Sequence, residues 1–379
     1  MRGLTAGGAA ALLLALLAWA APASLASVAG VAKMSPAAGL YVRYYSPTIA
    51  STGSSVVITA SDNRGDIDYW HQPYGQSGWP VQRVATGGAG ADYYSPVIAW
   101  TGSSVVIAAV SSSGLDTWTQ PGSGSTWTPQ PVATGSYSAP AIAVGAGLVA
   151  IAAIDSSGNI DYWYRSLSGG GWSSGQQVAA ASSAGSYSPP AIAVTQAGTV
   201  IASTAGGQML SWYEDLGVTS PYWFPVSVPP VPDNSYQTAA LTVTNLRVEL
   251  AGGFSGGATV WAQPIGQDVW GPSQYVTDSS PAPVPPSAVI AWNGNGGENN
   301  LVVANGDPSG DLWSYTQGSG GWGLNQVAAA AANTYSAPQL AAAGTSMVMT
   351  AIDNAGDVDY WYEPSVQGTW NEQPVAQVG

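Results

Sequence analysis

The apolar positions of this chain fall in short runs separated by polar turns, a pattern typical of short β-strands. Runs of β-branched and small apolar residues, such as SSVVITAS, SSVVIAAV and GLVAIAAI, are followed by the polar turns DNRG, SSSG and DSSG. After the N-terminal region no segment keeps an apolar period of 3.6 residues, so the pattern predicts no helix there. The Gly of each turn can supply the positive φ of a hairpin, so the runs before and after it are expected to pair.

The same pattern returns seven times. Each unit opens with an aromatic-Ser-Pro signal such as YYSPTIA, YSAPAIAV or YSAPQLAA, of which YQTAALTV and PPSAVIAW are degenerate forms. The β-branched run and the turn follow, then an aromatic run with a first Trp, a Gly/Ser loop, a second Trp and a short tail. The Trp pairs are Trp70/Trp79, Trp118/Trp127, Trp163/Trp172, Trp212/Trp223, Trp261/Trp270, Trp313/Trp322 and Trp361/Trp370.

First Trps of successive units lie 45 to 52 residues apart, and a repeat of this length with four short strands is typical of a β-propeller. We predict an all-β fold, a single seven-bladed β-propeller over residues 41–379 with four antiparallel strands per blade. The Ala-rich first strand should lie innermost, and both Trps should wedge between neighbouring blades. Residues 39–43, GLYVR, could add a strand that closes the ring. The predicted blades are about 44–92, 93–135, 136–185, 186–234, 235–283, 284–333 and 334–379.

Composition narrows the range of partners. The 379 residues include 7 Lys plus Arg and 21 Asp plus Glu, which gives a net charge of −14. Without basic clusters the chain is not suited to nucleic acid or to an anionic membrane surface. Because there is no Cys, no disulfide framework is possible, and packing alone must stabilise the fold.

The N-terminus has the features of a secretory signal peptide over residues 1–26. One Arg precedes the run AALLLALLAWAA, and Ala-x-Ala-like sites end at Ala23 or Ala26. Residues 27–40 are interpreted as a linker. The apolar run is too short for a comfortable membrane span, and an uncleaved anchor is the alternative. We therefore expect a secreted, extracellular protein with no membrane span after cleavage.

The unit YSAPAIAV…AIDSSGNIDYW…GGGW…QQVA resembles the repeats of bacterial seven-bladed propeller lectins and, more loosely, those of the tectonin and fucose-lectin propellers. The resemblance spans nearly the whole chain after the N-terminal region. It implies sugar binding in shallow pockets between blades. Similar repeats also occur in secreted bacterial proteins with no known role, so the fold does not by itself decide the function.

The candidate ligand-binding element is Asp-x-Trp on the third strand. Residues two apart on a strand face the same side, so a carboxylate lies beside an indole, which suits the hydroxyls and the C–H face of a sugar. The alternative is a structural Asp paired inside the seam between blades. The Tyr of the entry signal could line a pocket with the neighbouring blade's Trp, or could simply pack its own loop. The candidate residues are Asp68, Trp70, Asp116, Trp118, Asp161, Trp163, Asp311, Trp313, Asp359, Trp361, Tyr44, Tyr93, Tyr137, Tyr187 and Tyr335.

Two further features have both a functional and a plain interpretation. The fourth and fifth units lack Asp-x-Trp and carry VPPVPDN with Arg247 and Glu249, which indicates either a distinct partner surface or drift. The turns DNRGDID and DNAGDVD hint at Ca²⁺, but an ordinary Asp-Gly turn explains them as well. The Arg-Gly-Asp at 64–66 falls in one of these turns and is interpreted as coincidental.

Catalysis is not expected. His71 is the only His, no Cys is present, and the Arg residues occupy unrelated blade positions. We predict a non-enzymatic protein with no cofactor and no metal, which binds glycans or glycoconjugates weakly at up to five sites and gains avidity by multivalency. The alternatives are a protein-interaction scaffold and, with less support, a glycan hydrolase or lyase at the axial funnel.

Overall fold

The computed structural model describes residues 42–88, 92–122, 124–215, 222–231, 235–254, 257–276, 288–294, 301–307, 309–330, 334–364 and 369–377. The chain divides into two units, Met1–Lys33 and Met34–Gly379, and every described residue belongs to the second. The predicted signal peptide (1–26) and linker (27–40) lie outside the described residues. The described part of the chain contains strands and turns and no helix, and hence no helix that could span a membrane.

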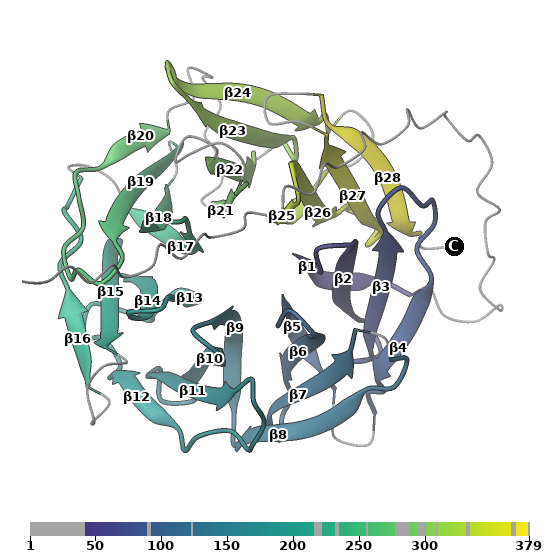
Figure 1. Cartoon of the computed structure of the whole chain (residues 1–379), viewed down its shortest axis with the longest axis horizontal. Coiled ribbons are helices and arrows are strands. Elements are labelled where there is room, and N and C mark those ends of the chain that lie inside the picture. The colour runs from purple at the N-terminus through teal and green to yellow at the C-terminus, as the bar shows by residue number, and fades with distance from the viewer. Residues whose placement is uncertain are drawn as a thin grey trace, which may run out of the picture. The chain divides into compact units, whose positions relative to one another are not determined.

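The strands form seven four-stranded antiparallel sheets, each made of four strands that follow one another in the chain. Figure 1 shows them as seven blades around one axis, with the first strand of each blade innermost. The predicted fold, a seven-bladed β-propeller with four antiparallel strands per blade, is therefore confirmed.

We number the blades in chain order and call the packed interface between two neighbouring blades a seam. Blade 1 contains β1 (Tyr44–Ser51), β2 (Ser55–Asp62), β3 (Ile67–Pro73) and β4 (Val81–Ala85). Blade 2 contains β5 (Tyr94–Trp100), β6 (Ser104–Val110), β7 (Gly114–Pro121) and β8 (Thr128–Thr134). Blade 3 contains β9 (Tyr137–Gly145), β10 (Leu148–Asp155), β11 (Ile160–Ser166) and β12 (Gln176–Ala179). Blade 4 contains β13 (Ala191–Val194), β14 (Gly198–Ala205), β15 (Gln208–Asp215) and β16 (Trp223–Val226).

The remaining three blades have the same order of strands. Blade 5 contains β17 (Tyr236–Val243), β18 (Arg247–Phe254), β19 (Gly257–Pro264) and β20 (Gln274–Val276). Blade 6 contains β21 (Val289–Trp292), β22 (Leu301–Gly306), β23 (Leu312–Gly318) and β24 (Gly321–Ala328). Blade 7 contains β25 (Ser336–Ala343), β26 (Ser346–Ile352), β27 (Val358–Glu363) and β28 (Asn371–Ala376).

Four of the innermost strands share a bulge at the entry motif. In each, the residue directly before the Pro has φ near +50° although it is not Gly, and the pairing with the second strand shifts register there. These residues are Ser46, Ser95, Ala139 and Ala337. A left-handed residue in a bulge bends the strand. The Pro that follows lacks an N–H and lies where the ladder is already interrupted.

The Gly of the turn between the second and third strands makes a hydrogen bond that connects one blade to the next. Gly65 has φ of +76°, and its carbonyl accepts the N–H of Tyr93, the entry Tyr of blade 2, at 3.0 Å. A Cβ on Gly65 would lie 2.7 Å from the Cα of Asp92, so the close approach requires Gly as much as the turn does. The same bond joins Tyr236 to Gly207 and Tyr335 to Gly310.

Among the described residues, contacts of this kind close the ring between blade 7 and blade 1. The N–H of Tyr44 donates to the Gly356 carbonyl at 3.1 Å, and Nη2 of Arg43 donates to the Asn354 carbonyl at 2.9 Å. Among the described residues, the sheet of blade 7 consists of β25–β28 alone. Val42 and Arg43 lie outside any strand. The described part of residues 39–43 therefore does not form the closing strand that we considered.

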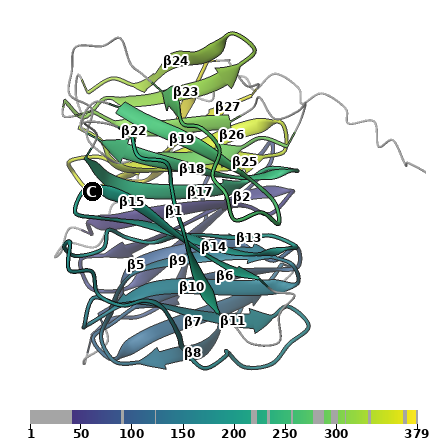
Figure 2. The same ribbon diagram turned by 90° about the vertical axis from the view of Figure 1, so that its left-hand side faces the viewer.

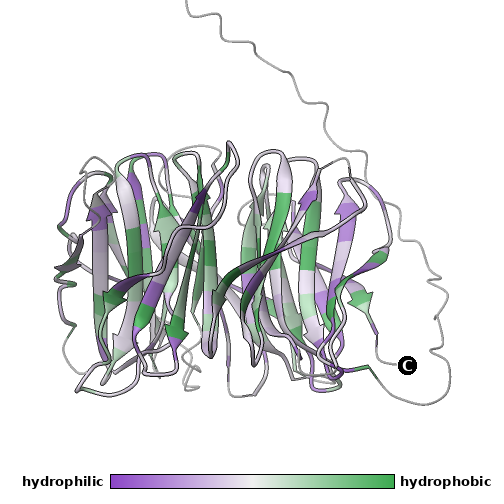
Figure 3. Ribbon diagram, turned by 90° about the horizontal axis from the view of Figure 1, so that it is seen from below, coloured by the Kyte–Doolittle hydropathy of each residue, from purple (hydrophilic) through white to green (hydrophobic). Residues whose placement is uncertain are grey.

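The core is divided among the seams, with one hydrophobic cluster in each of the seven. The second strands are the most completely buried, and every residue of β2 and β14 is buried. Figure 2 shows the sheets side by side around the ring, and Figure 3 shows hydrophobic stretches along their strands. Because each blade packs on two neighbours, the side chains in the seams determine what the surface can offer a ligand.

Candidate functional site

The first Trp of a pair lies in the core. In six blades this side chain is at most 8% exposed, and Trp163 of blade 3 is 2% exposed. Trp163 belongs to the cluster of the seam with blade 2, together with Val110 and Leu115. Its faces are therefore covered by protein, and the same holds for the other buried members of the set. The six residues are Trp70, Trp118, Trp163, Trp212, Trp261 and Trp361.

The entry Tyr lies against the first Trp of its own blade; the alternative that we considered was a pocket shared with the Trp of the neighbouring blade. The rings of Tyr137 and Trp163 are 5.2 Å apart between centroids and 87° between planes, an edge-to-face contact. Such pairs contribute about 0.5–1.5 kcal/mol beyond the area that they bury. The contact ties the start of the first strand to the third. It recurs in Tyr44/Trp70, Tyr93/Trp118, Tyr187/Trp212, Tyr236/Trp261 and Tyr335/Trp361.

Blade 6 departs from the predicted alignment. The residue paired across the sheet with the middle of the second strand is Tyr315, which is 2% exposed, and the half-buried Trp313 lies two positions earlier. Trp313 thus occupies the place that Asp holds in other blades, and its Nε1 donates to Oδ2 of Asp307 at 3.3 Å. Asp311 and Trp313 are therefore not an Asp-x-Trp pair of the common kind, and four such pairs remain, in blades 7, 1, 2 and 3.

The four carboxyl groups have different surroundings. In blade 1, Asp68 is 2% exposed and accepts hydrogen bonds from Nε of Arg83 at 2.6 Å and from the Tyr44 hydroxyl at 3.3 Å. Arg83 also binds Asp66. This Asp has the structural role that was the alternative to sugar binding.

The other three carboxyl groups face no Arg across the strand pair. The residues opposite them on the fourth strand are Pro131, Gln177 and Pro374, where blade 1 has Arg83. Burial raises the pKa of Asp116; burial, followed by the charge of Asp155, raises the pKa of Asp161 to about 6. Burial, then Glu372, Asp353 and Asp357, raises the pKa of Asp359 to about 7. Each of these carboxyl groups therefore ionises at some cost in the folded protein.

The second Trp of a pair reaches across to the preceding blade. Nε1 of Trp172 donates to Oγ1 of Thr117 in blade 2 at 3.2 Å. The residue that the second Trp contacts in the preceding blade lies directly before the first Trp of that blade, or directly before Tyr315 in blade 6. Where it holds Ser, the same bond forms, in Trp270/Ser211 and Trp370/Ser314. Where it holds Tyr, the rings meet edge-on, in Trp79/Tyr360, Trp127/Tyr69 and Trp223/Tyr162.

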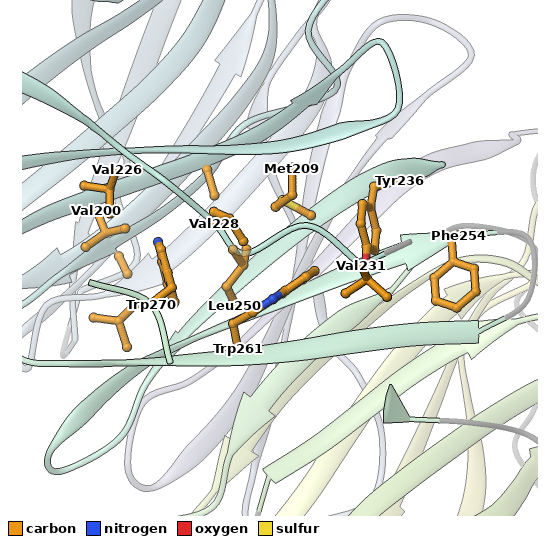
Figure 4. Packing of buried hydrophobic residues seen from close by; sticks show 13 residues of the cluster. Val200, Met209, Val226, Val228, Val231, Tyr236, Leu250, Phe254, Trp261 and Trp270 are labelled. Carbon is orange, nitrogen blue, oxygen red and sulfur yellow. The ribbon is translucent and has the colours of Figure 1, made fainter. Parts of the chain in front are cut away.

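Four second Trps are only half-buried, and these present indole surface at the outer part of a seam: Trp79, Trp127, Trp172 and Trp322. In blade 5, by contrast, both Trps are covered. Trp261 is 0% and Trp270 3% exposed, and they pack with Val228 and Val231 from the segment between blades 4 and 5. Figure 4 shows these side chains in one cluster. The divergent VPPVPDN segment (228–234), where it is described, thus fills the seam.

The position two residues after the first Trp, or after Tyr315 in blade 6, bridges several seams with a polar contact. Nε2 of Gln72 donates to Gln373 at 3.0 Å, Nε2 of Gln120 to Gln82 at 2.8 Å, and Nε2 of Gln317 to Gln274 at 2.9 Å. Each acceptor lies on the fourth strand of the preceding blade. Blades 4, 5 and 7 have Glu214, Gln263 and Glu363 at this position.

In blade 3 this position is Arg165, the one cation in the series. Its Nη1 donates to Oε1 of Gln130, and its Nη2 to Oγ1 of Thr119 at 3.3 Å. Its guanidinium lies over the ring of Trp172, 5.1 Å from the centroid. Burial lowers the pKa of Arg165, yet an Arg stays protonated in a protein. The sequence pattern did not single out Arg165, although Gln or Glu in all other units would have marked it.

A cavity of about 220 Å³ opens beside this guanidinium in seam 2–3. Its wall carries the hydroxyls of Thr101, Ser103 and Ser104 from the β5–β6 turn, those of Thr119 and Ser166, and Arg165. Leu167, 39% exposed, adds an apolar edge. Gly169 and Gly170 have positive φ and no atom near their missing side chains, so the backbone itself forms part of the rim.

A smaller cavity, of about 110 Å³, lies in seam 5–6. Arg247 and Glu249 of β18 both line it, with Gln274 and Gln317. The divergent sector predicted from Arg247 and Glu249 therefore does contain a hollow, but one that holds charges of both signs.

The acidic turns are held by their own backbone. Oδ1 of Asp353 accepts the N–H groups of Ala355, Gly356 and Asp357, each at 2.9 Å. In the other turn Asp62 binds the Arg64 guanidinium. Within the described residues no group of three or more His, Asp or Glu is placed to hold a metal ion. These turns are the ordinary Asp-Gly kind. In the Arg-Gly-Asp sequence, Arg64 binds Asp62 of the same turn, and Asp66 binds Arg83 of β4 and accepts the N–H of Gly87 at 2.7 Å.

Comparison with known proteins gives the fold. No protein-family model and no curated protein matches the chain. A crystal structure of a lectin from Burkholderia pseudomallei is similar, with a TM-score of 0.69 at 16% identity, over 89% of this chain and 100% of that one. A variant of the Aleuria aurantia lectin in complex with Fucα1-6GlcNAc has a TM-score of 0.54 at 14% identity, over 75% and 96%.

A chain in the crystal structure of the mitotic checkpoint complex is also similar, with a TM-score of 0.55 at 10% identity, over 92% of this chain and 99% of that one. At such identities the similarity establishes the propeller architecture and leaves the function to be argued from the site.

Proposed function

We propose that this protein is a secreted, non-enzymatic, carbohydrate-binding propeller. The observation that carries the proposal is the hydroxyl-lined cavity of seam 2–3, with Arg165 held over the half-buried Trp172. Hydroxyl and guanidinium groups can exchange hydrogen bonds with sugar hydroxyls, and small-ligand sites combine a few such groups with apolar surface. The similarity to two lectins supports the same class of function.

The polar groups near the Asp-x-Trp motif form a second candidate region. Asp116 and Asp161 are half-buried beside Tyr93 and Tyr137, whose pKa values are raised by burial and then by these carboxylates. They lie at the start of the third strand, whereas Arg165 lies at its end. We propose them as weaker sites that use carboxylate and hydroxyl groups without the buried indoles. Several weak sites on one ring raise avidity without better contacts.

A glycan array with the mature chain tests the proposal, followed by titration of the best ligand. Ser103 is exposed at the mouth of the cavity, so Ser103→Tyr should fill the cavity without entering the core and weaken binding at least tenfold. Ser54 occupies the equivalent exposed turn of blade 1, and Ser54→Tyr is the matched control that should bind normally. Absence of any glycan signal at high protein density would contradict the proposed carbohydrate binding. Equal binding by Ser103→Tyr would remove the site.

A protein-interaction scaffold is the second candidate function. Five of the exposed large apolar side chains belong to blades 4 and 5 and their loops: Tyr222, Phe224, Leu246, Val269 and Tyr275. Apolar side chains gathered on one sector are a feature of partner surfaces, and one similar fold is part of a multiprotein complex. Pull-down from cell-surface extract distinguishes the two functions. Capture that survives free sugar and deglycosylation, and is lost in Phe224→Asp, would favour the scaffold.

A further inference from the structure

We infer that the cavity of seam 2–3 selects glycans that carry a carboxylate, such as uronic or sialic acid residues. The inference rests on the proposed function and names the ligand class of the same site. Its starting point is the charge balance of the cavity. In a chain of net charge −14, the charged residue that lines this cavity is a cation. The larger of the two cavities described is therefore positive where the protein as a whole is negative.

Arg165 differs from the other described Arg side chains in its surroundings. Arg43 also forms no salt bridge with a described residue, but it lines neither cavity and donates to the Asn354 carbonyl. Arg64 and Arg83 form salt bridges with Asp residues of blade 1, and Arg247 shares its cavity with Glu249. Arg165 forms no salt bridge with any described residue, and no acidic side chain lines its cavity. A partly buried cation without a counter-charge favours an anionic ligand, because the ligand supplies the missing partner.

The guanidinium is also held in position for a planar anion. Thr119 and Gln130 each accept one of its N–H groups, so two of the five donors of an Arg are used by described residues. The ring of Trp172 supports one face. The remaining donors form part of a rigid fork that matches the two oxygens of a carboxylate, and such charged bidentate contacts are among the strongest hydrogen bonds in proteins.

The rest of the cavity fits a sugar better than a bare anion. The three hydroxyls of Thr101, Ser103 and Ser104 lie on the blade 2 wall, facing Ser166 and the Gly169–Gly170 backbone of blade 3. At about 220 Å³ the cavity is smaller than the roughly 300–1,000 Å³ of sites for drug-sized ligands. It therefore has room for one sugar residue, with its carboxylate at Arg165 and its hydroxyls at the hydroxyl-bearing walls.

The repeat itself supplies the matched variant. Blades 1, 2 and 6 have Gln at the position of Arg165, and each Gln binds a Gln of the preceding blade. Gln130 is the corresponding acceptor for blade 3, so Arg165→Gln should form the common amide bridge and keep the seam intact. The substitution removes the charge, together with the bond to Thr119 and the contact with the Trp172 ring, and keeps the bridge to Gln130.

The experiment compares acidic glycans with their methyl esters, for example methyl β-glucuronide with its ester, by titration against wild type and Arg165→Gln. Wild type should prefer the free acid at least tenfold, and Arg165→Gln should bind both forms equally while melting near the wild-type temperature. Arg165→Lys should keep part of the preference. Equal binding of acid and ester by wild type would overturn the inference and leave the proposed function intact, whereas binding of no glycan would overturn the proposed function as well.

Discussion

Trp163 and Trp172 lie nine residues apart in one blade and belong to the same repeated pair, yet they have different surroundings. Trp163 is enclosed in seam 2–3 with Val110 and Leu115. Trp172 lies half-buried at the outer part of the same seam, bonded to Thr117 and covered on one face by Arg165. The first Trp belongs to the cluster that packs the two blades together, whereas the second also takes part in what the seam presents to solvent.

The difference teaches that a ligand-facing residue must be sought in the second Trp of each pair. A third-strand side chain faces the neighbouring sheet, so an indole there is covered wherever the seam is filled. The second Trp comes from a loop or the outermost strand, where the neighbouring blade covers it only in part. Its exposure then depends on what else fills the seam, as Val228 and Val231 do in seam 4–5.

The largest expected effect is on stability, from Trp163→Ala. Removing a fully enclosed large side chain typically lowers the free energy of unfolding by about 3–5 kcal/mol. Chemical denaturation followed by circular dichroism measures it. A decrease in the free energy of unfolding below about 1 kcal/mol would show that the seam repacks around the missing side chain. It would contradict the assignment of Trp163 to the core and of Trp172 to the surface.

The carboxyl groups beside the first Trps should make the stability of the core depend on pH, which gives a second test of how the first Trps are buried. The pKa of Asp359 is about 7 in the folded protein, above its unfolded value of about 3.9. The folded state therefore holds this proton more tightly, so the contribution of Asp359 to stability is fully present below about pH 4 and is lost as pH rises from about 4 to 7. At about 1.4 kcal/mol for each pKa unit, Asp359→Asn should raise the free energy of unfolding at pH 8 by roughly 2–4 kcal/mol. It should change little at pH 4, which serves as the internal control, and an unchanged difference across this range would contradict the argument.

Trp172→Ala should destabilise less and affect ligand binding more. The indole is only partly buried and rests against Arg165 on one face, so we expect a loss of roughly 1–2 kcal/mol in stability. Without the ring, Arg165 loses the surface on which it rests, and glycan affinity should fall at least tenfold. Titration and denaturation of the same preparation give both numbers, and a stability loss equal to that of Trp163→Ala would remove the distinction.

The smallest effect is expected from Thr117→Val, which removes the acceptor of the Trp172 Nε1–H. Blade 5 has Val260 at the equivalent position, in the same cluster as Trp322. Oγ1 of Thr117 also donates to the Gln130 carbonyl at 2.9 Å, so two hydrogen bonds are lost. The net cost should still be about 1 kcal/mol, because blade 5 accommodates an apolar Val at this position. Thr101→Val, a hydroxyl on the cavity wall away from Trp172, is the control for general loss of polarity. A change of several kcal/mol in Thr117→Val would mean that the bond, not the packing of the ring, positions the second Trp.

Much of the architecture could be predicted because the repeat specifies it locally. The turn Gly, the apolar second strand and the Trp pair are each visible within one unit, and seven similar units leave few ways to bury their apolar faces. The alignment of Asp311 and Trp313 with the Asp-x-Trp pairs of other blades was wrong. It matched residue types and ignored the number of residues that separate the first Trp from the turn. In blades 1, 3, 4 and 7 the first Trp follows the last Gly of the turn by five residues, and the same count from Gly310 gives Tyr315.

The site was harder to predict because it depends on contacts between units. The cavity needs the β5–β6 turn of one blade and the β11–β12 loop of the next, and no spacing within a unit shows how far these approach. Burial of the first Trps likewise depends on the neighbouring sheet. The departure of Arg165 from the Gln and Glu of other units was visible, but its meaning depends on the amide bridge that it replaces.

The way the ring closes has a consequence for the order of the chain. Blade 7 meets blade 1 through Gly356 and Tyr44, Gln373 and Gln72, and Tyr360 and Trp79, the same kinds of contact that join blades within the chain. Among the described residues, each of the seven sheets consists of four strands that follow one another in the chain, so every blade is complete wherever counting starts. Linking the start of blade 1 to the end of blade 7 and cutting between any other two blades would yield a circular permutant with the same seven modules.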